Sequence, residues 1–148
     1  MSKFSLSLAK IVGSPRGNTG CWIHTFLPPQ EEKANRRGQL FAVATLSGLT
    51  AEEEIAVAGK ELISRLHEEY YGDLSDTAFI RLRKTVEKVS QEFKAEIAAV
   101  AVVRGVFNVA LIGGRLIFCR GGKTLNLLAG SPEGGVKTGS GYLQNQDL

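Results

Sequence analysis

The sequence has few of the residues that usually build metal or nucleophile sites, with only two histidines and two cysteines. His24 and His67 have no partner at the spacing of zinc ligands, so neither zinc binding nor acid–base catalysis is indicated. Cys21 and Cys119 lie far apart in strand-like runs, and nothing beside Cys21 marks it as an activated nucleophile. We expect two buried free thiols and a reducing cytoplasmic location, where disulfides are uncommon.

Long apolar runs and dense basic clusters are also lacking. No run approaches the roughly 18 apolar residues of a membrane span, and residues 1–10 lack the apolar core of a signal peptide, so no membrane contact is expected. The net charge is +3, but basic residues are interspersed with acids. The densest basic group falls on the polar side of a predicted helix, so we expect no nucleic-acid partner. That group is Arg81, Arg83, Lys84 and Lys88.

The remaining composition is that of a globular protein, with 43% hydrophobic and 22% charged residues in 148. This length fits one domain with one core, since domains usually hold roughly 100 to 150 residues. Apolar runs with alternating or β-branched patterns predict strands. The turn-forming stretch 13–20, the polar segment 30–38 and the glycine-rich stretch 130–141 are predicted to be turns or loops. The predicted strands are 3–12, 21–27, 39–45, 97–103, 106–112, 115–120 and 124–128.

Two tandem amphipathic helices are predicted in the middle of the chain. Thr50 and Glu53 have the spacing of a capping box, and the helix that they open runs to about Tyr71. Ser75 or Asp76 is expected to cap the second helix. Each helix repeats apolar residues every three or four positions, which indicates one face turned to a core. These stripes are Ile55, Ala58, Leu62, Leu66 and Tyr70, then Phe79, Leu82, Val86, Val89 and Phe93.

The glycine motifs do not indicate a nucleotide site. Gly122-Lys123-Thr124 resembles the end of a Walker A motif, but that motif needs glycine where Ile117 stands, and a hairpin is expected here. Glycines 13, 17 and 20 do not have the spacing of a dinucleotide fingerprint. Both stretches are predicted to be turns.

The order of strands, two tandem helices and a β-meander resembles the PPM-type (type 2C) protein serine/threonine phosphatases. In that family, a strand ends in Val-Ala-Asp-Gly-Met-Gly-Gly before the first long helix, and this chain has Val43-Ala44-Thr45-Leu46-Ser47-Gly48. The family's later Gly-Asp-Ser-Arg hairpin resembles the segment 110–122. The resemblance spans roughly residues 10–148 and implies an α+β fold with layered antiparallel sheets, a β-sandwich, and two long antiparallel helices.

The departures from the family pattern concern its metal ligands. Active relatives hold two Mn²⁺ or Mg²⁺ ions with aspartates, and the metals activate a bridging water. Thr45 stands where the metal-bridging aspartate would be, the segment Asn18-Thr19-Gly20 has no carboxylate, and Gly114 replaces the hairpin aspartate. Arg16 matches the family's phosphate-binding arginine. The resemblance therefore implies degenerate metal positions, no catalytic residues and no cofactor.

The resemblance implies a single phosphatase-like domain over residues 1–148 that corresponds to the N-terminal portion of the family fold. The leading hypothesis is an inactive phosphatase-like module with a binding or regulatory role and a protein partner. One alternative is an active metal-dependent phosphatase whose remaining ligands lie beyond Leu148. Another is a structural subunit that forms homo-oligomers through open β edges.

Overall fold

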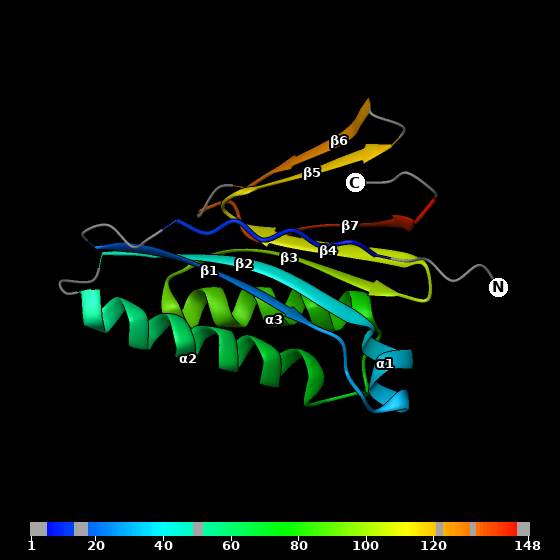
Figure 1. Cartoon of the computed structure of the whole chain (residues 1–148), viewed down its shortest axis with the longest axis horizontal. Coiled ribbons are helices and arrows are strands. Elements are labelled where there is room, and N and C mark those ends of the chain that lie inside the picture. Colours follow the sequence, from blue (N-terminus) through cyan, green and yellow to red (C-terminus); the bar gives the residue numbers. More distant parts are fainter. Residues whose placement is uncertain (1–5, 14–17, 49–51, 121–122, 131–132, 145–148) are drawn as a thin grey trace.

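An antiparallel five-stranded sheet forms the centre of the molecule, with helices on one side and a two-stranded hairpin on the other (Figure 1). The computed structural model describes residues 6–13, 18–48, 52–120, 123–130 and 133–144. The strand order in the large sheet is β1-β2-β3-β4-β7, and β5 and β6 pair with each other. The strands are β1 (Thr19–Phe26), β2 (Gln39–Ser47), β3 (Glu96–Val103), β4 (Val106–Ile112), β5 (Arg115–Arg120), β6 (Lys123–Ala129) and β7 (Lys137–Tyr142). The predicted α+β class is confirmed.

Two tandem helices, α2 (Glu52–Tyr71) and α3 (Ala78–Phe93), run side by side in opposite directions beneath the sheet (Figure 1). Their predicted stripes face the core. Ile55, Leu62 and Leu66 of α2 are at most 1% exposed, and the same holds for Leu82, Val86 and Val89 of α3. The predicted capping box at Thr50 lies outside the described residues. No helix in the described part of the chain is both long and apolar enough to cross a membrane.

The start of α3 corrects one prediction. Thr77 caps the helix by accepting a hydrogen bond from the backbone N–H of Ile80, and neither Ser75 nor Asp76 does so. Asp73 instead accepts from the backbone N–H of Ser75 and closes the preceding turn. The carboxylate of Asp76 is paired with Arg81 and Lys84.

Three segments differ from the sequence-based prediction. Residues 6–12 of the predicted first strand form no strand, because no neighbouring strand pairs with them, and Leu6 and Leu8 remain 44% and 50% exposed. The predicted loop 30–38 contains a short helix, α1 (Glu31–Arg37), with acidic residues in its first turn and arginines in its last. The predicted loop 130–141 contains most of β7, which gains its order by pairing with β4.

The predicted meander divides into two sheets. Strands β3 and β4 form the expected hairpin, with Arg104 and Gly105 at positive φ in its turn. The next hairpin, β5–β6, leaves the main sheet and lies on the side opposite the helices (Figure 1). Phe107 of β4 stacks on Phe118 of β5 with ring centroids 4.7 Å apart. This aromatic contact fixes the hairpin over the outer face of the sheet.

A buried arginine organises the end of the sheet where β2 begins. Arg37 is fully buried, and its guanidinium donates to the backbone carbonyls of Tyr70, in the last turn of α2, and of Asp73 and Asp76, which lie in the turn between α2 and α3. The Tyr70 hydroxyl donates back to the Arg37 carbonyl over 2.7 Å. The Tyr71 hydroxyl contacts the carbonyls of Phe26 and Gly38. These bonds tie α1, α2 and the helix–helix turn to the sheet.

Candidate functional site

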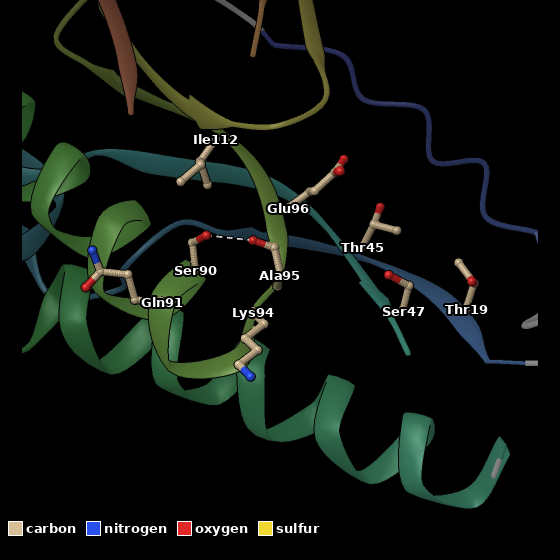
Figure 2. Close-up of a pocket in the computed structure, with 9 residues that line it drawn as sticks. All are labelled: Thr19, Thr45, Ser47, Ser90, Gln91, Lys94, Ala95, Glu96 and Ile112. Carbon is tan, nitrogen blue, oxygen red and sulfur yellow. Dashed lines mark hydrogen bonds between the residues drawn. The ribbon is translucent and has the colours of Figure 1, made fainter. Parts of the chain in front are cut away.

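A pocket of about 520 Å³ opens at the other end of β2, where β1 and β3 begin and β4 ends (Figure 2). Its volume is in the range of small-ligand sites, roughly 300 to 1,000 Å³. The sheet contributes hydroxyl, carboxylate and apolar side chains, and the last turn of α3 with the two residues after it contributes the rest. The lining residues are Thr19, Thr45, Ser47, Ser90, Gln91, Lys94, Ala95, Glu96 and Ile112.

Strand pairing brings these side chains together from distant parts of the sequence. Thr19 pairs with Ser47 across β1 and β2, and Thr45 pairs with Glu96 across β2 and β3. Residues paired in register project from the same face of a sheet, so Thr45 and Glu96 are neighbours. Lys94 adopts a left-handed conformation with φ 51° as the C-cap of α3, and this turn directs the chain into β3.

Most polar side chains of the pocket have unused hydrogen-bonding capacity. Within the described ranges, Thr45, Ser47 and Glu96 form no side-chain hydrogen bond or ion pair, and the same holds for Gln91 and Lys94. Ser90 is the exception in α3, because its hydroxyl donates to the carbonyl of Ala95 over 2.6 Å. Unpaired polar groups that converge on a concave site are the usual signature of ligand binding.

The charged groups of the pocket point in different directions. Glu96 projects to the same side as Thr45, whereas Lys94 extends away from Glu96 toward the helices (Figure 2). Glu96 is the only carboxylate among the described lining residues. The C-terminal end of α3, which carries partial negative charge, also lies at the pocket. The described lining therefore carries one negative charge, on Glu96 beside Thr45, and one positive charge, on Lys94, which extends toward the helices.

The predicted degenerate metal positions only partly meet in this pocket. Thr19 and Thr45 line it, and Asn18 is next to it, where its amide oxygen accepts from the Thr19 hydroxyl over 3.5 Å. Gly20 faces α2 instead, since a Cβ there would lie 2.7 Å from Ile55. Gly114 is an exposed turn residue with φ 65° and does not line the pocket. The predicted phosphate-binding residue, Arg16, lies outside the described residues.

Sequence reasoning missed Glu96, Ser47 and Lys94 as pocket residues. Glu96 was not singled out because its proximity to Thr45 depends on strand register and not on sequence spacing. The one feature of the sequence that could have pointed to Glu96 is the glycine pair Gly113-Gly114 in the β4–β5 turn. A Cβ on Gly113 would lie 2.5 Å from Cγ of Glu96, so the glycine leaves room for the glutamate side chain.

The residues present do not fit the pair of Mn²⁺ or Mg²⁺ ions that active PPM-type phosphatases use. Hard divalent cations require several oxygen ligands, with carboxylates supplying most of the negative charge. The described lining residues provide one carboxylate, Glu96, and several neutral hydroxyls. No group of three or more histidine, cysteine, aspartate or glutamate residues among the described residues is arranged to hold a metal.

The two histidines, which have no ligand-spaced partner in the sequence, come together between β1 and α2. Nε2 of His24 lies 3.3 Å from Nδ1 of His67, and Phe26 packs edge-on against the His67 ring at 4.4 Å between centroids. Burial lowers the pKa of His24 first, with further lowering from His67 and Lys10. Burial also lowers the pKa of His67, assisted by Lys33 and opposed by Glu68. Both imidazoles are therefore neutral near pH 7.

The thiols and the basic cluster also have clear positions. Neither Cys21 nor Cys119 is part of a disulfide in the described part of the chain, and both are only partly buried, so the prediction that they are buried is wrong. Three of the four basic residues of the cluster pair with acids. Arg81 contacts Asp73 and Asp76, Lys84 contacts Asp76, and Lys88 contacts Glu69.

Comparisons of the chain with protein-family models, with curated proteins and with solved structures gave no match.

Proposed function

We propose that this chain is a catalytically inactive PPM-type phosphatase-like domain that acts as a binding or regulatory module for a protein partner. The observation that carries the proposal is the pocket, in which Thr45 and Thr19 meet with one carboxylate where the family pattern has clustered aspartates. A site of this composition binds through hydrogen bonds and one charge, and it lacks the ligands for metal-activated water.

The finer fold assignment is part of the same proposal. In it, the β5–β6 hairpin is the start of a second sheet, and the chain corresponds to the N-terminal portion of a phosphatase-like sandwich. The position of the hairpin supports this assignment, because it lies over the sheet face opposite α2 and α3 (Figure 1). The acid-paired basic residues Arg81, Lys84 and Lys88 favour a protein partner over a nucleic acid, since their charge is already neutralised.

The direct test combines calorimetry with a phosphatase assay. We expect no heat of binding at the pocket when Mn²⁺ or Mg²⁺ is added, and no metal-dependent hydrolysis of p-nitrophenyl phosphate or a phosphopeptide. Metal-dependent turnover that disappears when Thr45 or Arg16 is substituted would contradict the proposal. That result would favour the alternative of an active phosphatase with further ligands beyond Leu148.

A gain-of-binding variant tests whether the pocket occupies the position of a lost metal site. Thr45→Asp places a second carboxylate beside Glu96, and we expect it to create weak Mn²⁺ binding that the unchanged chain lacks. Val43→Asp is the matched control, because Val43 lies two residues earlier on the same strand face and is 42% exposed, but does not line the pocket. Equal binding by both variants would show that any added carboxylate suffices.

A second candidate function, assembly of copies through sheet edges, is favoured by the composition of β1. This edge strand has one neighbouring strand, β2, and contains no charged residue or proline. Monomeric proteins usually protect edge strands with charges, prolines or bulges. The other edge strand, β7, begins with Lys137 and contains two glycines. Two β1 strands related by a two-fold axis would pair without bringing like charges together.

Light scattering over a range of concentrations tests this assembly. Thr25→Lys places a charge on β1, and Ser140→Lys places the same charge on β7. If assembly uses β1, only Thr25→Lys lowers the average mass. A chain that stays monomeric at the highest concentration excludes the candidate.

A further inference from the structure

We infer that the pocket binds the guanidinium group of an arginine side chain presented by the partner protein, with Glu96 as the ion-pair acceptor. This inference deepens the proposed function and rests on it, because a pocket loaded with two metal cations would repel a cationic group. It specifies the charge and the shape of the chemical group that the pocket recognises.

The charge distribution supports a cationic ligand. Glu96 is the only carboxylate in the described lining, and it forms no ion pair within the described part of the chain. Its side chain lies against Gly113, which positions the carboxylate beside Thr45. Lys94 extends away from Glu96 (Figure 2), and the α3 terminus adds partial negative charge. A phosphate or carboxylate ligand would meet repulsion from Glu96.

The hydrogen-bonding groups favour guanidinium over ammonium. A guanidinium has five N–H donors in one plane and can engage a carboxylate with two parallel bonds. Its remaining donors need acceptors close to the carboxylate. The hydroxyls of Thr45 and Ser47 have no partner among the described residues and lie on the same pocket wall. An ammonium group has three donors and is more strongly hydrated, so it gains less from this wall.

The site is built from the rigid part of the fold. Thr45 and Glu96 lie within paired strands of the five-stranded sheet, and Ser90 fixes the α3–β3 turn through its bond to Ala95. The paired strands fix the backbone of these acceptors, so binding has to order only their side chains, of which Glu96 and Ser47 are exposed. The pocket is therefore ready to accept a side chain without rearrangement of the sheet.

The experiment is a titration of the ¹⁵N-labelled chain, in EDTA, with short blocked peptides observed by NMR. The probes are acetyl-Gly-Arg-Gly-amide, the same peptide with citrulline, the same peptide with lysine, methylguanidine and inorganic phosphate. Citrulline has nearly the shape of arginine without its charge. We expect the arginine peptide to shift amide signals of β2 and the α3–β3 turn, the lysine peptide to bind more weakly, and citrulline and phosphate to cause no shifts.

Two variants with matched charge changes identify the acceptor. Glu96→Gln should weaken binding of the arginine peptide about tenfold or more, as expected for loss of a hydrogen bond to a charged group. Glu87→Gln removes the same charge from an exposed position of α3 outside the pocket, and binding should change less than about twofold. Thr45→Val serves as a second variant and should weaken binding without changing the net charge.

Several outcomes overturn the inference. If the citrulline peptide shifts the amide signals as much as the arginine peptide does, the positive charge of the ligand has no role. If phosphate shifts the amide signals of the pocket, the pocket prefers an anion and not a cation. Methylguanidine that binds as tightly as the peptide would point to a small guanidine compound, and not to an arginine side chain of a protein, as the ligand. No binding by a chain that also lacks metal-dependent turnover overturns this inference alone, whereas metal-dependent turnover overturns it together with the proposed function.

Discussion

At the Gln39 end of β2, the buried guanidinium of Arg37 is hydrogen-bonded through all three of its nitrogens, whereas at the Ser47 end several polar side chains have no partner within the described ranges. The Arg37 guanidinium is fully buried and donates from Nε and both terminal nitrogens to carbonyl oxygens. Thr45, Ser47 and Glu96 line an open pocket and form no side-chain bonds to other described residues. A saturated network stabilises the fold, and an unsaturated one is available to a ligand.

The largest effect should come from breaking the saturated end. Arg37→Met leaves the carbonyls of Tyr70, Asp73 and Asp76 without their buried donor, so we expect the free energy of unfolding to fall by about 3 kcal/mol or more. Urea unfolding measures this loss. Arg36→Met is the neighbouring control and should cost less than about 1 kcal/mol, because Arg36 is exposed. If both variants lost the same unfolding free energy, the buried network of Arg37 would not be what stabilises this end of β2.

Substitution of the glycines that flank β2 should also cost more stability at the Gln39 end, where Gly38 lies, than at the Ser47 end, where Gly48 lies. Gly38 has φ 63° and ψ −154°, a region almost limited to glycine, and a Cβ there would lie 1.9 Å from the carbonyl oxygen of Val102. We expect Gly38→Ala to lower the free energy of unfolding by about 2 to 3 kcal/mol. Gly48 has φ 85° with no atom within 4 Å of the Cβ position, so Gly48→Ala should cost about 1 kcal/mol. Thermal or urea unfolding compares the two, and similar costs would count against the difference between the ends.

The histidine pair should make stability depend on pH in one direction. Burial lowers the folded-state pKa of both His24 and His67 below 6.5, so the unfolded chain binds more protons just below that value. The free energy of unfolding should therefore fall as the pH drops below about 6.5 and should change little between pH 7 and 8. Urea midpoints across this range measure the slope. His24→Gln should reduce it, and an unchanged slope would assign it to other groups.

The smallest effect is expected at the pocket. Glu96→Gln removes a charge that has no ion-pair partner in the described part of the chain, so the free energy of unfolding should change by less than about 0.5 kcal/mol. Differential scanning calorimetry is sufficient for this measurement. A large loss would show that Glu96 supports the fold, which would weaken its assignment to binding.

The amphipathic helices could be predicted because their signal is local. The stripes of α2 and α3 repeat every three or four residues, and Leu62, Leu66, Leu82 and Val86 are buried as expected. The apparent strand at 6–12 shows the limit of such patterns. Its alternation is the same as in a real strand, but a strand also needs a partner, and none pairs with it.

The pocket could be predicted only in part. The resemblance of the segment 43–48 to a phosphatase motif draws attention to Thr45 as a degenerate metal position, and the structure shows that Thr45 lines the pocket. Glu96 was missed because its position beside Thr45 follows from the pairing of β2 with β3, which sequence spacing does not reveal. β7 was missed for the same reason, since a glycine-rich stretch becomes a strand only through its pairing with β4.

Trp22, the chain's only tryptophan, gives the molecule a built-in optical probe. A Cβ on Gly59 would lie 2.0 Å from the indole, so the ring rests on the backbone of α2, and it also lies over Gly20 at the start of β1. Its fluorescence therefore reports one event, the separation of the edge strand from the helix below it. Comparison of this emission with far-UV circular dichroism, which follows the whole chain, would distinguish loosening of β1 from global unfolding with no label added.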